Sequence, residues 1–147
     1  MKSITFDMDG TIADLYSVDN WLPQIINGDS APYREARPLV NMSKLARHLN
    51  KLQKDGYKLC IVSWGCKNSS KNFLQDTQAV KKQWLARHLK SVHWDSIEIV
   101  PYGTPKSTVC PYYNNEAVLF DDEEKNRTEW GDTAFPETQI FEVLKNL

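Results

Sequence analysis

The N-terminal segment places two carboxylates directly after a short apolar strand. Residues 3–11 read Ser-Ile-Thr-Phe-Asp-Met-Asp-Gly-Thr, so that Asp7 and Asp9 are separated by a single residue. An exposed strand does not favour this pair, because aspartate is depleted in strands and like charges repel. The carboxyl end of a buried parallel strand accommodates it, because open α/β sheets bind ligands there. Two such carboxylates indicate a divalent cation, and oxygen ligands favour Mg²⁺. A polar Asp-Gly turn is the alternative.

Strand-like and helix-like segments alternate along the rest of the chain. The sequence predicts five strands, at residues 4–6, 57–62, 97–100, 117–120 and 134–135, and three helices, at residues 42–54, 73–89 and 137–147. This alternation is typical of an α/β protein with a parallel sheet and helices on both faces. We therefore predict one domain over residues 1–147, with a three-layer, Rossmann-like sheet of about five strands. Right-handed crossovers then bring the carboxyl ends of all the strands to one edge.

Residues 15–38 interrupt the passage from the first strand to the first long helix. The stretch is too short for a separate domain and contains Trp21, Pro23, Gly28, Pro32 and Pro38. We expect a small cap-like insertion over the active edge, helical around residues 18–26. Whether it acts as a lid stays open.

Composition narrows the class of partner. The net charge of −1 gives no overall field for capturing nucleic acid or an acidic membrane. The local basic run of Lys81, Lys82, Arg87, His88 and Lys90 is expected to be the solvated face of a helix. No apolar run approaches the roughly 20 residues of a membrane span.

The three cysteines are odd in number and lack metal-ligand spacing, which favours a reduced, cytoplasmic environment. We expect Cys60, within a predicted strand, to be a core residue.

Polar residues follow four of the predicted strands in a fixed order: Asp7 and Asp9, then Ser63, then Lys106, then Asp121 and Asp122. Each signal is weak alone, because a serine after a strand is usually a helix cap and a lone lysine is usually solvated. Together, at the ends of successive strands, they indicate one functional site.

With this set of motifs the chain resembles the haloacid dehalogenase (HAD) superfamily of phosphohydrolases. The signature of that superfamily is Asp-x-Asp-Gly-Thr, a strand-terminal Ser or Thr, a Lys, and a strand-terminal acidic pair, and the resemblance covers residues 1 to about 130. It implies a HAD-like fold and a Mg²⁺-dependent phosphomonoesterase. Asp9 favours a phosphatase over the ion pumps of the superfamily, which carry threonine at that position.

The resemblance also implies roles for individual residues. Asp7 would be the nucleophile that forms an aspartyl-phosphate, and Asp9 the acid for the leaving group and then the base for water. Mg²⁺ would be held by Asp7, the backbone carbonyl of Asp9, and Asp121, with Asp122 in support.

The phosphate would be bound by Ser63, by the following loop at Trp64 and Gly65, and by Lys106. Lys81 or Lys82 could also reach the site. We favour Lys106, because the loop before a helix next to the acidic pair is the usual position in the superfamily.

The small size of the insertion at residues 15–38 is informative about the class of substrate. The run Asp-Met-Asp-Gly-Thr-Ile-Ala-Asp and the later Lys-x-x-Trp-Leu are similar to the small-capped 5′(3′)-deoxyribonucleotidases of the superfamily. The expected substrate is therefore a phosphorylated small molecule, most simply a nucleotide. Trp21, Tyr33 and Trp64 are candidates for stacking on a base; packing is the favoured role for Trp21, and the two roles are balanced for Trp64. A nucleic-acid end phosphatase and a non-catalytic phospho-ligand binding protein are the alternatives, and the sequence gives no oligomeric state.

Overall fold

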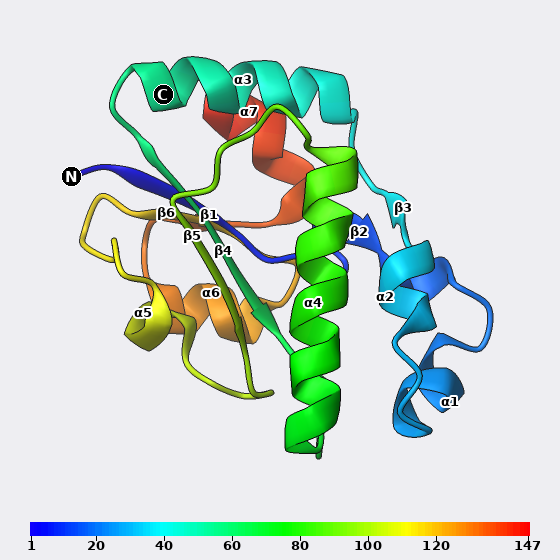
Figure 1. Cartoon of the computed structure of the whole chain (residues 1–147). Helices are drawn as coiled ribbons and strands as arrows, with labels where there is room; N and C mark the ends of the chain where they lie inside the picture. Colours follow the sequence, from blue (N-terminus) through cyan, green and yellow to red (C-terminus); the bar gives the residue numbers. More distant parts are fainter.

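A computed structural model describes all of residues 1–147 and contains a central sheet of five parallel strands (Figure 1). In spatial order the strands are β5 (Ser96–Val100), β4 (Lys58–Trp64), β1 (Ser3–Phe6), β6 (Val118–Phe120) and β7 (Ala134–Phe135). Every neighbouring pair is parallel, and β1 lies in the centre with Thr5 between Cys60 and Leu119. The predicted fold class and all five predicted strands are confirmed.

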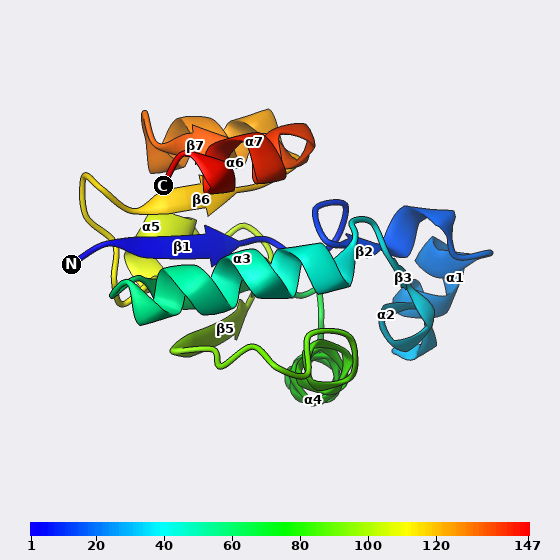
Figure 2. The same ribbon diagram turned by 90° about the horizontal axis from the view of Figure 1, so that it is seen from above.

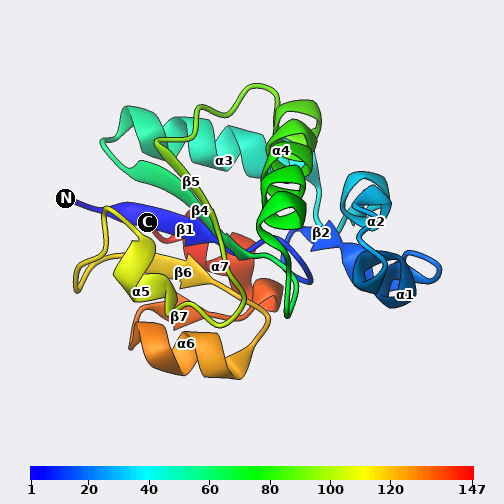
Figure 3. The same ribbon diagram turned by 60° about the horizontal axis from the view of Figure 1, so that its bottom comes forward.

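Alternating side chains of the strands face two helical layers. One layer contains α3 (Met42–Lys54), α4 (Lys71–His88) and α7 (Ile140–Lys145), which pack with Ile4, Phe6 and Ile61 in the main core. The other contains α5 (Lys106–Val109) and α6 (Glu124–Trp130), with Cys60 and Leu119 in a second apolar cluster. Figure 3 shows α3 and α4 on one side of the sheet and α5 and α6 on the other. The three-layer arrangement follows from the period-2 alternation of strand side chains.

Helix boundaries agree best where the apolar period is strong. The predicted helix at residues 42–54 coincides with α3, and that at 73–89 corresponds to α4. The predicted closing helix is divided into a 3-10 turn, η2 (Glu137–Gln139), and α7. Helices α5 and α6 were not predicted, because α5 has four residues and α6 carries a single apolar side chain, Trp130, that gives no period.

The insertion forms a small unit beyond the carboxyl ends of the strands (Figure 2). It consists of η1 (Leu15–Ser17), α1 (Trp21–Ile26) and α2 (Ala31–Glu35), between the antiparallel strands β2 (Ala13–Asp14) and β3 (Arg37–Pro38), which the sequence analysis did not predict. A third apolar cluster, with Leu15, Ile25, Tyr33 and Val80, attaches it to α4. None of the helices combines the length and apolar content that crossing a bilayer requires.

Candidate active site

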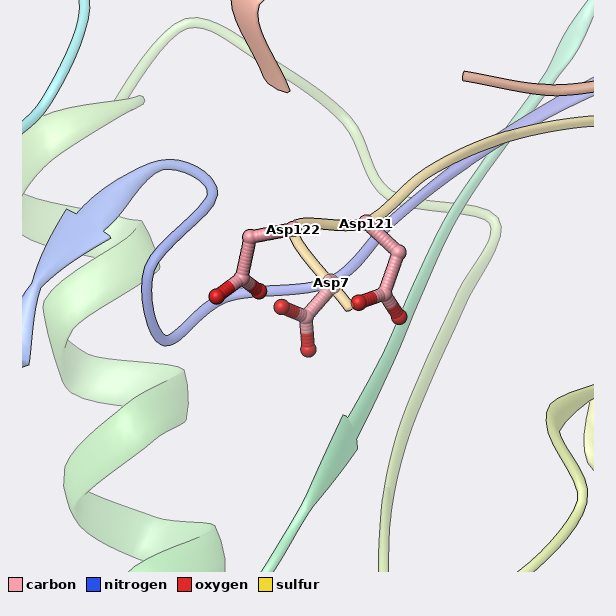
Figure 4. Close-up of side chains that lie close together, drawn as sticks. All are labelled: Asp7, Asp121 and Asp122. Carbon is pink, nitrogen blue, oxygen red and sulfur yellow. The ribbon is translucent and has the colours of Figure 1, made fainter. Parts of the chain in front are cut away.

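Three carboxylates converge where β1 and β6 end. Asp7, Asp121 and Asp122 each offer one oxygen, and these oxygens all lie within 4.8 Å of one another. Figure 4 shows the three side chains pointing toward a common space. Asp121 is completely buried and Asp7 nearly so. The parallel register of β1 and β6 places the two strand ends side by side, which brings together residues that are far apart in sequence.

The loop after β1 fixes the position of Asp7. The backbone N–H groups of Thr11, Ile12 and Ala13 all donate to the carbonyl oxygen of Met8. This tight turn places the Thr11 hydroxyl 2.8 Å from Asp7 Oδ2, and the same hydroxyl accepts a hydrogen bond from the backbone N–H of Asp122. Thr11 therefore ties the β1 loop to the acidic pair after β6.

Lys106 supplies the positive charge next to this cluster. Its ammonium, on a side chain that is 1% exposed, donates to Asp7 Oδ1 at 2.8 Å and to Asp121 Oδ2 at 2.7 Å. Burial lowers the pKa of Lys106, but attraction to the two carboxylates outweighs burial and leaves the pKa raised. Lys106 is therefore charged, and it binds two of the three carboxylates in the cluster.

Burial and the excess of negative charge both raise the pKa values of the acidic pair, Asp121 and Asp122. Burial, followed by repulsion from Asp7, raises the pKa of Asp121 to about 6 and that of Asp122 to about 8. Oxygen ligands gathered at this spacing, with more negative than positive charge, suit a hard cation such as Mg²⁺. The residues present therefore fit the cation that the sequence analysis expected, with Asp7, Asp121 and Asp122 as its side-chain ligands.

Asp9 lies beside the cluster but points to a different lysine. Its Oδ2 is 2.8 Å from Lys81 Nζ, and its carboxylate is not one of the three that converge. From the sequence, Asp9 was expected to bind the metal through its backbone carbonyl and to use its side chain for acid–base chemistry. Burial raises the pKa of Asp9 and so favours the protonated form, while Lys81 opposes the shift. A carboxyl group of this kind suits a general acid.

The structure brings both Lys106 and Lys81 into the site, while Lys82 is exposed. The expectation that Lys81 belongs to a solvated basic face is wrong, because its side chain is 1% exposed. A sequence signal for this was present: Lys81 follows Val80 and lies one helical turn before Leu85, which places it on the apolar face of α4. The buried residues of α4 share this face. They are Thr77, Val80, Lys81, Trp84 and Leu85.

A cavity of about 310 Å³ opens beside the carboxylates. Asp7, Asp9, Asp121 and Asp122 line its floor, and Trp64 and Gly65 line its wall, as do Tyr16 and Trp21 of the insertion. Ser63, expected to bind phosphate, is completely buried, and its hydroxyl accepts from Lys81 at 2.7 Å.

Aromatic side chains form two groups around the cavity. Trp64 and Tyr102 pack with ring centroids 4.9 Å apart, and the Trp64 indole N–H donates to the carbonyl of Thr104. Tyr16 and Trp21 form an edge-to-face pair 5.1 Å apart. Tyr33 is 4% exposed and its ring lies over Lys81, so that it packs the insertion against α4.

No protein-family model and no curated protein sequence matches the chain. Among solved structures, it is similar to a D,D-heptose 1,7-bisphosphate phosphatase from Burkholderia thailandensis, with a TM-score of 0.53 and 13% identity over 88% of this chain and 72% of that one. A structure from Vibrio cholerae aligns with a TM-score of 0.42 and 16% identity, covering 99% of this chain and 98% of the other. At 13% identity the first likeness bears on architecture alone. The fold is HAD-like.

Within this HAD-like fold, two polar residues that hold the carboxylate cluster had not been predicted. Thr11 was part of the recognised motif but had no assigned role, and Asn126, which donates to Asp121 Oδ2 at 3.2 Å, was not considered. Asn126 comes from α6, a helix without an apolar period, so no sequence pattern indicated its position.

Proposed function

We propose that this protein is a Mg²⁺-dependent phosphomonoesterase that works through an aspartyl-phosphate on Asp7. One observation supports this most strongly. Asp7 and Asp9 are separated by a single residue, yet each is held by a different lysine, which suits a nucleophile and an acid–base group side by side. Asp7 has Oδ1 bound by Lys106 and Oδ2 bound by Thr11, inside the three-carboxylate cluster. Asp9 stands beside it, held by Lys81 and facing the same cavity.

The chemistry would proceed in two displacements. A carboxylate oxygen of Asp7 attacks phosphorus while the bond to the leaving oxygen breaks, and Asp9 gives that oxygen a proton. Asp9 then takes a proton from water as the water attacks phosphorus, which breaks the Asp7–phosphorus bond and releases phosphate. Lys106 has two protein acceptors and retains a third N–H for a phosphoryl oxygen. Mg²⁺ held by Asp7, Asp121 and Asp122 would supply the charge that lets an anionic carboxylate approach an anionic phosphate.

A nucleotide is the substrate that the cavity supports best. Its walls carry the Trp64–Tyr102 and Tyr16–Trp21 pairs, and a stacked base contributes about 1–3 kcal/mol. The net charge of −1 offers little attraction for a long nucleic-acid chain, which favours a mononucleotide over a nucleic-acid end.

The test is phosphate release from nucleoside monophosphates, ribose 5-phosphate, oligonucleotides phosphorylated at the 3′ or 5′ end, and an aryl phosphate, with Mg²⁺ or with EDTA. We expect Mg²⁺-dependent release that falls by at least about 10⁴-fold in Asp7→Asn, because the nucleophile is lost. Asp132→Asn, an exposed position outside the cavity, should behave as wild type. A stacked base should raise kcat/KM over ribose 5-phosphate by roughly 5- to 150-fold.

The other outcomes separate the alternatives. Faster release from oligonucleotides than from mononucleotides would replace the nucleotide substrate by a nucleic-acid end. Tight binding of phosphorylated ligands with no release, unchanged in Asp9→Asn, would identify a non-catalytic binding protein. Equal rates of release from nucleoside monophosphates and from ribose 5-phosphate would contradict only the proposed stacking of a base, and not the phosphatase activity.

A further inference from the structure

Lys81 has every donor of its ammonium engaged within the protein. The ammonium donates to Asp9 Oδ2 at 2.8 Å, to Ser63 Oγ at 2.7 Å and to the carbonyl oxygen of Trp64 at 2.9 Å. The Tyr33 ring covers it, with the centroid 4.6 Å from Nζ. Because a lysine ammonium has three N–H donors, Lys81 has none left for a phosphate.

Lys106 and Lys81 therefore differ in the number of N–H donors that they can offer a ligand. Lys106 makes two hydrogen bonds, to Asp7 and Asp121, and keeps a donor for a ligand. Lys81 makes three and keeps none. Its charge can act on the reaction only through the groups that it holds.

The bond to Ser63 fixes the direction in which that hydroxyl donates. An ammonium can donate but cannot accept, so Ser63 Oγ must be the acceptor in the contact with Lys81. The hydroxyl proton of Ser63 is then free, and Ser63 makes no other side-chain hydrogen bond. A serine that accepts from a fixed cation on one side is left to donate on the other.

The bond to Asp9 has a parallel effect. Lys81 engages Oδ2, while Oδ1 has no hydrogen-bond partner in the protein. Asp9 lines the cavity, so its free oxygen is available for the proton transfers proposed above. The third bond, to the carbonyl of Trp64, holds the end of β4 in the same arrangement.

We propose that Lys81 is a positioning residue that presents one oxygen of Asp9 and the hydroxyl proton of Ser63 to the phosphate without contacting the substrate. This rests on the proposed phosphatase function. The insertion contributes Tyr33, which excludes water from the ammonium and links α2 to the acid–base group.

The test compares Lys81→Met with Lys82→Met, its exposed neighbour, on two substrates. An alkyl phosphate needs a protonated leaving group, whereas 4-nitrophenyl phosphate has a leaving group that departs as an anion. Positioned proton transfer contributes about 10²–10⁴-fold. We expect Lys81→Met to lower kcat/KM for the alkyl ester by about 10³-fold and for the aryl ester by about tenfold, because only the first needs Asp9 as an acid. Lys82→Met should match wild type.

Three further measurements keep the result interpretable. The Mg²⁺-induced rise in Tm should persist in Lys81→Met, because Lys81 contacts none of Asp7, Asp121 and Asp122. Lys81→Gln, which keeps an N–H donor on a side chain one bond shorter, should fold if the methionine variant does not, and should show the same substrate difference with a smaller loss. In an Asp9→Asn background, Lys81→Met should cost only about tenfold for the alkyl ester, the part that acts through Ser63, because the part that acts through Asp9 is already lost.

Equal losses on both esters would overturn the positioning role while leaving the phosphatase function in place. Full activity of both Lys81 variants would also overturn it. Absence of phosphate release by the wild-type protein from either ester would overturn the proposed function, and this proposal with it.

Discussion

Gly10 shows how closely single residues are fitted around the acidic cluster. It follows Asp9 directly and has a φ of +81°, a conformation that side chains rarely adopt. A Cβ atom at this position would collide with the Asp122 carboxylate and lie 2.8 Å from the Tyr16 ring. The glycine is therefore needed twice, for the turn and for the space that Asp122 occupies.

We predict that Gly10→Ala displaces Asp122 from Asp7 and weakens the response to Mg²⁺. Gly28→Ala is the matched control, because Gly28 has a φ of +79° but a Cβ there would meet no atom within 4 Å. Both variants should lose about 1–2 kcal/mol of stability from backbone strain. Thermal unfolding with and without Mg²⁺ should show a reduced Mg²⁺-induced shift in Gly10→Ala only. Equal Mg²⁺ responses in the two variants would contradict the steric argument.

At the scale of elements, α4 joins the insertion to the sheet. Its buried face carries Lys81 toward the site and Trp84 toward the insertion, where the indole N–H donates to the carbonyl of Ala36 at 2.8 Å. Arg87, one turn further on, donates to the carbonyl of Arg34. One helix thus holds Asp9 and the insertion in a fixed relation.

We predict that Trp84→Phe lowers the free energy of unfolding by about 1–3 kcal/mol, because a buried carbonyl loses its donor. Trp94→Phe provides the comparison, since the indole nitrogen of Trp94 is buried without a partner and its removal breaks no hydrogen bond. Urea unfolding of the two variants measures the difference. A loss in Trp94→Phe as large as that in Trp84→Phe would show that ring volume, and not the bond to Ala36, sets the cost.

For the whole molecule, the acidic edge is a source of instability that a cation would remove. The pKa values of Asp121 and Asp122, about 6 and about 8 in the folded protein, lie above the ordinary aspartate value of 3.8. The folded protein therefore binds protons that the unfolded chain has released. This stabilising contribution is complete below about pH 4 and is lost as pH rises through 6 and 8.

We predict that in EDTA the Tm of wild type falls relative to that of Asp122→Asn between pH 5 and pH 9. Over the same range the Mg²⁺-induced rise in Tm of wild type should grow, because the ligands are then deprotonated. A cation at about 100 times its Kd contributes about 2.7 kcal/mol. Thermal unfolding across this range checks both trends. A Mg²⁺-induced rise in Tm that does not change with pH would refute the assignment of Asp121 and Asp122 as ligands of the cation.

The sheet, its long helices and the residues at the strand ends were predictable from the sequence alone. These features are local: strand and helix periods are written in consecutive residues, and parallel connections place Asp7, Ser63 and Asp121 at one edge whatever the details of packing. Lys81 also lies at the helical spacing of the apolar residues of α4, although its charge suggested a position on the solvated face.

The pairing of the lysines with the carboxylates, by contrast, is known only from the folded chain. Which lysine meets which carboxylate depends on the reach of side chains from α4 and α5, and no residue pattern states that Lys81 takes Asp9 and Lys106 takes Asp7. The same holds for Asn126, which comes from a helix without an apolar period, and for the aromatic wall contributed by the insertion. These contacts join segments far apart in the chain, so they are set by the packing of the insertion and helices around the sheet.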